Sequence, residues 1–179
     1  MEMLKGFPIK KYLGKKPPSD NSFTTKKEIE ELKNTPIKKR YIEENDDIAK
    51  TFGKIVNEDK FVQNVINKSS PVILKIKRHY NRPRPKVLAK KMGVKMKDVE
   101  LPSMKTPSYP SGHSTQGFLI AMLLSDKYPS KKNKLMKAAR NISDSRRAAR
   151  AHYMSDSRFG EEIGKGMYSY IKKKNEKKA

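Results

Sequence analysis

The sequence predicts an all-α protein that folds as one compact helical bundle. Apolar residues recur at helical intervals in several segments, whereas no stretch of useful length alternates apolar and polar residues as a strand would. Serine, threonine and proline stand where these segments begin or break, as helix caps and helix breakers do. With 179 residues and no internal repeat, the chain has the length of a single domain that can bury a core.

The first part of the chain predicts an arm and then short helices. Residues 1–22 are rich in proline, lysine and serine without any period, so we expect an extended basic arm. Thr25 and Glu28 have capping-box spacing, which predicts a helix to about residue 33. A longer helical pattern follows, from Pro36 to about residue 57.

The middle of the chain is divided by prolines. A short helix is expected around residues 61–66, and Pro71 is expected to begin another that runs to Tyr80 and breaks at Pro83 and Pro85. Residues 92–110 contain several prolines and little periodicity, so we expect a long loop of the kind that often shapes a site in a small domain.

The last part predicts three helices. They cover Ser111–Lys127, Lys131 to about Ala151, and a final helix that Ser155 or Asp156 caps and that ends near Ile171. Residues 174–179 are expected to fray as a basic tail. The organisation predicted is therefore an arm at 1–22, one helical domain at 23–173, and the tail.

Positive charge dominates the composition. Lysine and arginine number 42 against 19 acidic residues, a formal net charge of +23. Such a field attracts anions, whether nucleic acid, an acidic membrane surface or small phosphorylated substrates, although a lysine-rich solvated surface explains the bulk charge equally well. Cysteine is absent, which excludes disulfides and thiolate metal sites.

The apolar segments indicate a soluble protein. The longest apolar run, residues 118–124, has seven residues, against the roughly 20 needed to cross a bilayer. The N-terminus has no apolar stretch of the signal-peptide type. We therefore expect a cytoplasmic protein, or a periplasmic or secreted one if the N-terminus has been processed.

Three segments have the chemistry of phosphate binding. In the first, basic residues crowd the stretch from Lys75 to Pro85, where prolines must end a helix, and such a cluster can surround a dianion. Judged alone, the segment also suits an ordinary basic helix terminus. His79, within it, is expected to pack or to support rather than to catalyse.

The second segment, Pro110-Ser111-Gly112-His113, leads into an apolar helix. Free N–H groups and the positive end of a helix dipole make a phosphate site, and Gly112 leaves the backbone open to an anion. Ser111 can cap the helix and donate to an oxyanion, while His113 can protonate a leaving group. A plain serine cap followed by a histidine is the alternative.

The third segment carries Arg146, His152 and Asp156. Arg146 can grip two phosphate oxygens. His152 can attack phosphorus through one ring nitrogen if the other donates to Asp156, which fixes the tautomer. A surface helix with a His–Asp pair at i,i+4 would look the same. The chain has only three histidines, and each lies in one of these segments, so the three segments together favour a phosphate site.

These residues resemble the three-part signature of the type 2 phosphatidic acid phosphatase superfamily, in its soluble acid phosphatase branch. The matches are Lys77-x6-Arg84-Pro85, Pro110-Ser111-Gly112-His113 and Ser145-Arg146-x5-His152-x3-Asp156, within roughly residues 36–172. Lys75-x6-Arg82-Pro83 also fits the first part, shifted by two. The later register is preferred, because the surrounding Lys-x-His-Tyr-x-Arg-x-Arg-Pro resembles the soluble enzymes.

The resemblance implies a role for each matched residue. His152 would be the nucleophile, His113 would protonate the leaving alcohol and then activate water, and Asp156 would orient His152. The implied phosphate ligands are Lys77, Arg84, Ser111, Gly112 and Arg146. The family forms a helical bundle with the site at one end, and it uses no metal or other cofactor for hydrolysis.

The expected function is therefore metal-independent hydrolysis of phosphate monoesters on small molecules, through a phosphohistidine. Two alternatives stay open. A vanadate-dependent haloperoxidase could present the same anion pocket, and a degenerate member of the family could serve as a basic nucleic-acid-binding protein. Few aromatic residues are interleaved with the basic runs, although base stacking would require them.

Overall fold

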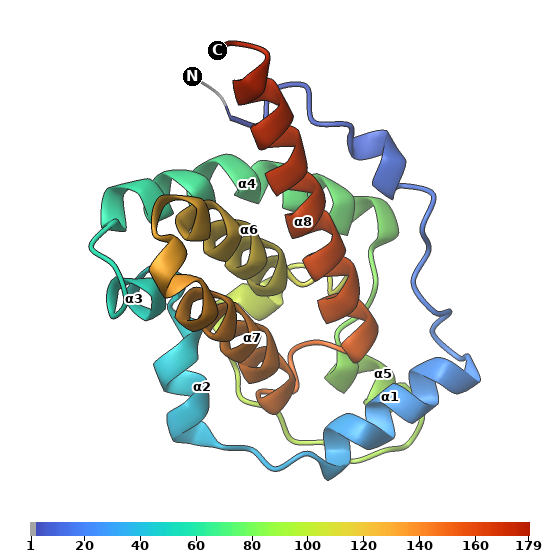
Figure 1. Ribbon diagram of the computed structural model, residues 1–179. Coiled ribbons are helices and arrows are strands. Elements are labelled where there is room, and N and C mark those ends of the chain that lie inside the picture. The colour runs from blue at the N-terminus through green and yellow to red at the C-terminus, as the bar shows by residue number, and fades with distance from the viewer. Residues whose placement is uncertain (1–2) are drawn as a thin grey trace.

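Three long helices at the C-terminal end of the chain form the centre of the protein in the computed structural model, which describes residues 3–179 (Figure 1). They are α6 (Gly112–Lys127), α7 (Lys132–Ala148) and α8 (Met154–Glu176). Helix α6 packs against both α7 and α8. No strand occurs in the part of the chain that is described, and the predicted all-α class is confirmed.

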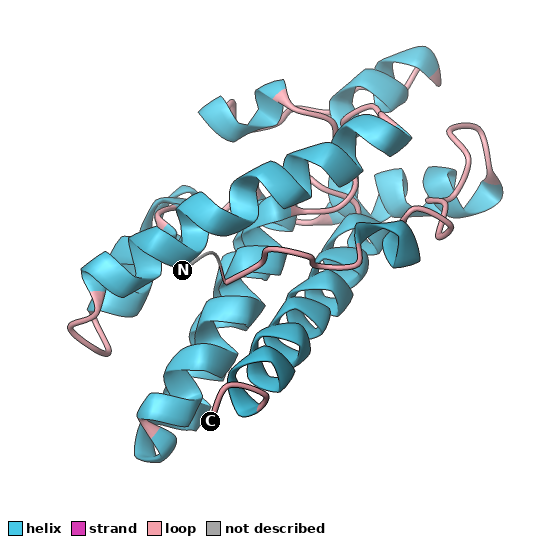
Figure 2. Cartoon of the chain, turned by 90° about the horizontal axis from the view of Figure 1, so that it is seen from above, coloured by secondary structure: helices cyan, strands magenta, loops and turns pink. Residues whose placement is uncertain are grey.

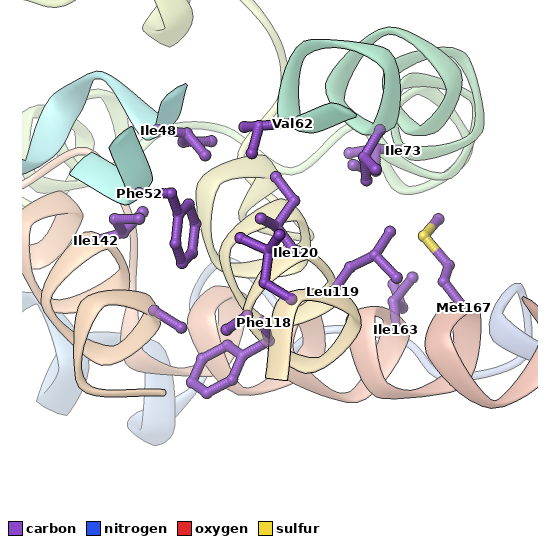
Figure 3. Close-up of a cluster of buried hydrophobic side chains, with 14 of the residues drawn as sticks. Ile48, Phe52, Val62, Ile73, Phe118, Leu119, Ile120, Ile142, Ile163 and Met167 are labelled. Atoms are coloured by element: carbon purple, nitrogen blue, oxygen red, sulfur yellow. The ribbon is translucent and has the colours of Figure 1, made fainter. Parts of the chain in front are cut away.

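Helix α6 is the middle of the core because it is apolar on almost every side. Phe118, Leu119 and Ile120 are consecutive in the sequence and all buried, which is the pattern of a helix enclosed by other helices. Figure 3 shows side chains from several elements around it, including Phe52, Val62, Ile142, Ile163 and Met167.

Helices α6 and α8 lie unusually close, because α8 presents glycines toward α6. A Cβ on Gly160 would lie 2.5 Å from the carbonyl oxygen of Ser111, and a Cβ on Gly164 would lie 2.5 Å from that of Thr115. Both distances are too short for any real side chain. The two glycines, one helical turn apart, thus hold the start of α8 against the start of α6.

Helix α4 (Asp59–Tyr80) is continuous, whereas the sequence pattern predicted two helices divided at Pro71. A proline inside a helix removes one hydrogen bond to the carbonyl four residues earlier. Here that carbonyl belongs to Asn67, which is on the exposed side of α4, so water can replace the lost amide. The helix ends at Asn81, whose φ of 48° is left-handed. Helix α5 (Pro85–Lys91) then begins with Pro85 in its first turn.

The shorter N-terminal helices differ from the prediction in their boundaries. Helix α1 (Phe23–Asn34) begins one turn early, because the hydroxyl of Ser22, not of Thr25, caps it. The pattern from Pro36 to about residue 57 is two helices, α2 (Lys39–Asp46) and α3 (Ile48–Gly53). Asp47 divides them, since its carboxylate accepts from the amide of Lys50 at 2.9 Å and caps α3.

The last helix is also longer than expected. Tyr153 rather than Ser155 or Asp156 is the cap residue, and α8 runs to Glu176 instead of ending near Ile171. Residues 92–110 form a loop with one 3-10 turn, η2 (Pro102–Lys105). None of the helices within residues 3–179 has both the length and the hydropathy that crossing a membrane requires.

The segment before α1 has little regular structure, but it packs on the bundle. Within residues 3–22, the one 3-10 turn is η1 (Ile9–Tyr12). Leu4, Phe7 and Tyr12 are buried in the main core, and the ring of Phe7 stacks on that of Tyr12 at 5.5 Å. Figure 2 shows the helices and loops of the chain from a second direction.

Candidate active site

The three predicted phosphate-binding segments, remote in sequence, meet around one cavity of about 260 Å³. It lies among the C-terminal half of α4, the start of α6 and the junction of α7 with α8. Five of the predicted site residues line it: Lys77, Arg84, Gly112, His113 and His152. The remaining lining residues come from α4, α6 and the 92–110 loop: Ser70, Ile73, Leu74, Ser103, Thr106 and Gln116. Larger surface hollows of about 360 and 500 Å³ hold none of the predicted site residues.

His152 lies in the wall of this cavity and is 2% exposed. Its Nδ1 is 3.0 Å from Oδ2 of Asp156, and a carboxylate only accepts, so Nδ1 carries the proton. Its Nε2 is 2.9 Å from Nη1 of Arg84, and a guanidinium only donates, so Nε2 carries the lone pair. Burial, together with Arg84 and other nearby cations, holds the pKa of His152 well below its ordinary value. The ring is thus neutral, and its unprotonated Nε2 accepts from Arg84.

Asp156 is completely buried behind His152. Its Oδ2 also accepts from the hydroxyl of Ser108 and, at 3.1 Å, from the amide of Tyr153. Its Oδ1 accepts from Nη1 of Arg82 at 2.8 Å. Burial raises the pKa of Asp156 to about 6, and the charge of Arg82 opposes that rise. The carboxylate is therefore ionised at neutral pH, and its position is fixed from several directions.

Arg84 is held by the loop on the other side of the cavity. Its Nε donates to the carbonyl of Thr106 at 2.8 Å, and its Nη2 donates to that of Ser103 at 2.9 Å. Burial lowers the pKa of Arg84 to about 10, so the side chain stays charged at neutral pH.

Lys77 is buried beside Arg84, and its Nζ donates to the carbonyl of Pro107 at 2.8 Å. Burial lowers the pKa of Lys77 to about 7, and the charges of Arg84 and Arg146 add to the effect. An amine with that pKa is readily protonated when an anion binds beside it, because an opposite charge favours the protonated form.

Gly112 opens the cavity next to Lys77. A Cβ at this position would lie 3.7 Å from Ile73 and 3.8 Å from Cε of Lys77, both ordinary contacts. Packing of the protein alone does not require glycine here, but any side chain would occupy space beside the amine. The missing side chain therefore leaves room for a ligand.

His113 and Arg146 share a partner that the sequence pattern did not indicate, Asp46 at the end of α2. Nε2 of His113 lies 2.9 Å from the carbonyl oxygen of Asp46 and must donate to it, which leaves Nδ1 as the unprotonated nitrogen. Nη1 of Arg146 is 2.6 Å from Oδ1 of Asp46, and Nη2 is 2.5 Å from the hydroxyl of Ser103. Burial and the charge of Arg146 lower the pKa of His113 to about 3.

Three of the predicted site residues lie behind the cavity wall. Asp156 is one, as described above. Arg146 is 1% exposed, and its Nε has no hydrogen-bond partner among the described residues. Ser111 is fully buried and caps α6, since its hydroxyl accepts from the amide of Ser114 at 3.2 Å.

The two readings of the first motif differ clearly in position. Lys75 is exposed on α4, and Arg82 is buried behind the cavity, where it stacks on Tyr153 at 3.8 Å and pairs with Asp156. Lys77 and Arg84 instead line the cavity. His79 faces away from it and contacts the carbonyl of Leu13 at 3.1 Å.

Several residues at the site were not found from the sequence. Asp46 and Ser103 have no motif spacing, and only the fold brings them to the site. Gln116 follows His113 by three residues on the helix that the sequence predicted, and this spacing is a signal that could have pointed to it. Ser108 lies two residues before the second motif, and the need of a buried carboxylate for several donors is a signal that could have pointed to it. Arg82 was named only in the alternative register of the first motif, not as the partner of Asp156.

Comparisons with known proteins point to one family. The family model described as the PAP2 superfamily, the type 2 phosphatidic acid phosphatases, matches residues 61–173, which contain all three motifs. A non-specific acid phosphatase of Salmonella typhimurium is 35% identical over 88 residues, 49% of this chain and 35% of that protein. A non-specific acid phosphatase of Salmonella typhi is 34% identical over 88 residues with the same coverage. The alignment thus spans about a third of the length of these curated relatives. Because the family model matches more than half of the chain, the protein belongs to the PAP2 superfamily.

Proposed function

We propose that this protein hydrolyses phosphate monoesters of small molecules, without a metal ion, through a phosphohistidine at His152. One observation carries the proposal: the unprotonated Nε2 of His152 lies in the wall of a cavity lined by Lys77 and Arg84, and Asp156 fixes the tautomer. Membership of the PAP2 superfamily and the likeness to two acid phosphatases support the same reaction class.

The first step transfers the phosphoryl group to the protein. The phosphate enters beside Lys77 and Arg84, and its oxygens replace the loop carbonyls and Nε2 of His152 as partners of these side chains. The electron pair of Nε2 forms the P–N bond while the ester P–O bond breaks, and its electrons leave with the alcohol oxygen. That oxygen takes a proton from Nδ1 of His113.

His113 must carry that proton before cleavage, although its pKa in the empty site is about 3. Burial and the charges of Arg146, Lys77 and Arg84 lower this pKa. A bound phosphate dianion offsets the positive charges and raises the pKa of His113 toward its ordinary value. Substrate binding therefore itself charges the general acid.

The second step releases phosphate. His113, now neutral, takes a proton from a water molecule whose oxygen attacks phosphorus. The P–N bond breaks, and its electrons return to Nε2 of His152. The sum of both steps consumes one water and yields one alcohol and one phosphate.

A substrate screen with chelator present tests this function. Phosphate release from aryl, sugar and nucleotide monoesters should persist in excess EDTA, because Lys77, Arg84 and Arg146 supply the positive charge. Vanadate should compete with the substrate, since its five-coordinate form resembles the transferring phosphoryl group, and such analogues bind more tightly than substrates. Activity that disappears in EDTA and returns with Mg²⁺ or Zn²⁺ would contradict the metal-independent mechanism. If the protein instead oxidises halide, and does so only with added vanadate and peroxide, it is a haloperoxidase and not a phosphatase.

A further inference from the structure

One polar side chain in the cavity has no part in this chemistry. Gln116 lies on α6, three residues after His113, so the two side chains share one face of the helix, with Cβ atoms about 5–6 Å apart. Gln116 is 8% exposed and lines the cavity together with Ser70 of α4.

Two serines of α4 determine which way its amide points. The hydroxyl of Ser69 donates to the carbonyl of Val65 at 2.7 Å, and that of Ser70 donates to the carbonyl of Ile66 at 2.7 Å. Each hydroxyl has a single proton, and these bonds use it. Toward any further neighbour, Ser69 and Ser70 can therefore only accept.

The amide nitrogen of Gln116 is the donor that meets them. Its Nε2 lies 3.1 Å from the hydroxyl of Ser69 and 3.0 Å from that of Ser70. The carbonyl of Ile66, also an acceptor, is 3.3 Å away. A flipped amide would put its oxygen against these acceptors, so the nitrogen must face α4.

The amide oxygen is consequently left for the cavity. No group among residues 3–179 donates to Oε1 of Gln116, and this oxygen is not among the polar atoms sealed away from solvent. A nearly buried side chain thus has its donors satisfied and its acceptor open, beside the group that would protonate the ester oxygen.

We propose that Oε1 of Gln116 accepts a hydrogen bond from a hydroxyl of the leaving group, so that the preferred substrates are phosphate esters of small polyhydroxy alcohols. This inference rests on the proposed function. One turn of helix separates Gln116 from His113, which suits a hydroxyl roughly two or three atoms beyond the ester oxygen. Ile73 and Leu74 provide an apolar wall for the carbon skeleton. The volume of about 260 Å³ is below the range of sites for drug-sized ligands, roughly 300–1,000 Å³, which favours a compact alcohol.

A pair of substrates of equal length tests the proposal in the unmodified protein. Glycerol 3-phosphate and n-propyl phosphate have the same three-carbon chain, and only the first carries hydroxyls. We expect kcat/KM to be about tenfold higher for glycerol 3-phosphate, the effect of one hydrogen bond in a partly enclosed site. Equal values in an active protein would overturn the inference and leave the proposed function intact. No phosphate release from either ester, or from an activated aryl phosphate, would overturn both.

Replacement of Gln116 tests whether its amide causes the preference for glycerol 3-phosphate. Gln116→Met keeps the length of the side chain but removes the acceptor, together with the amide nitrogen that faces α4. It should bring the ratio of the two kcat/KM values close to one, whatever its effect on the activity toward both esters. Gln63→Met, on the exposed face of α4, is the matched control and should keep the preference. A Gln116→Met protein that loses both substrates equally, or keeps the preference, shows that the residue only ties α6 to α4. The ratio in the unmodified protein tests the proposal even where this variant fails to fold.

Discussion

Lys77 is the cation at the site whose charge is most open to change, because burial brings its pKa to about 7. The protonated amine attracts phosphate, and it predominates below that pKa. Above it, the free protein loses the charge, so binding of a phosphate dianion has to take up one proton. We therefore expect the inhibition constant of phosphate to rise about tenfold per pH unit between pH 7.5 and 9.5, the effect of one linked proton.

Lys77→Arg isolates this effect, since a guanidinium stays charged over the whole range. The variant should bind phosphate with little dependence on pH in the same interval. An identical rise in Lys77→Arg and in the unmodified protein would assign the proton to another group.

The residues within the three motifs could be predicted from the sequence. The residues outside the motifs that hold them in place could not. Five of the residues that the three motifs predicted line the cavity: Lys77, Arg84, Gly112, His113 and His152. Asp46 escaped prediction because it is 100 residues from Arg146 along the chain, and no local pattern encodes such a contact. The same holds for Ser103, which reaches the cavity only through the packing of the loop. Gln116 was missed although it follows His113 by three residues on a helix that the sequence predicted.

Among the helices, the contact of α8 with α6 depends most directly on single residues. Gly160→Ala would place a methyl group 2.5 Å from the backbone oxygen of Ser111, which cannot move like the end of a flexible side chain. Overpacking of this kind costs about 1–3 kcal/mol, against a gain of roughly 1 kcal/mol from better helix propensity. We expect a net loss of stability in urea denaturation. We also expect the proposed phosphatase activity to fall, because Ser111 directly precedes Gly112, which lines the cavity.

Gly14→Ala is the control for this experiment. A Cβ at Gly14 meets nothing within 4 Å, so the change should alter the free energy of unfolding by no more than about 0.5 kcal/mol. If Gly160→Ala is equally harmless in stability and activity, α8 does not position the start of α6.

The presence of a helix was easier to predict than the residues at which it begins and ends. The apolar run and the Ser111 cap predicted α6 correctly, since both signals are local. Pro71 misled the prediction, because whether a proline breaks a helix depends on what replaces the lost hydrogen bond. Asn67 is exposed, so water can take the place of the lost amide at its carbonyl. Only the packing of α4 shows that Asn67 is exposed.

Over the whole molecule, the segment before α1 is part of the core. Phe7 is 7% exposed and lies between the rings of Tyr12 and Tyr170. Phe7→Ala should therefore lower the free energy of unfolding by about 3–5 kcal/mol, as expected for a buried phenylalanine. Phe23→Ala is the matched control, because Phe23 is 82% exposed and its loss should cost no more than about 0.5 kcal/mol. Equal midpoints in urea for the two variants would mean that the segment does not stabilise the bundle.

The composition of residues 1–22 predicted only a basic arm, because lysines and prolines outnumber the few apolar residues that pack on the bundle. Leu4, Phe7 and Tyr12 have no helical or strand period, so their burial depends on the surface of the folded bundle, where Phe7 and Tyr12 meet aromatic rings of α8. The all-α class, by contrast, follows from periodicity spread over the whole chain, and no single contact could overturn it.

The account depends above all on the covalent role of His152, and trapping of the phosphoenzyme tests that role most directly. A labelled, activated aryl phosphate is mixed with the protein, quenched rapidly in alkaline denaturant, and the label is located by peptide mapping. The unmodified protein should carry label on His152, and His152→Ala should carry none and show no turnover. His113→Ala should still become labelled, because an activated leaving group does not need a proton, and the label should persist longer, since water activation is lost. Label retained in His152→Ala, or found on another residue of the unmodified protein, would contradict the mechanism.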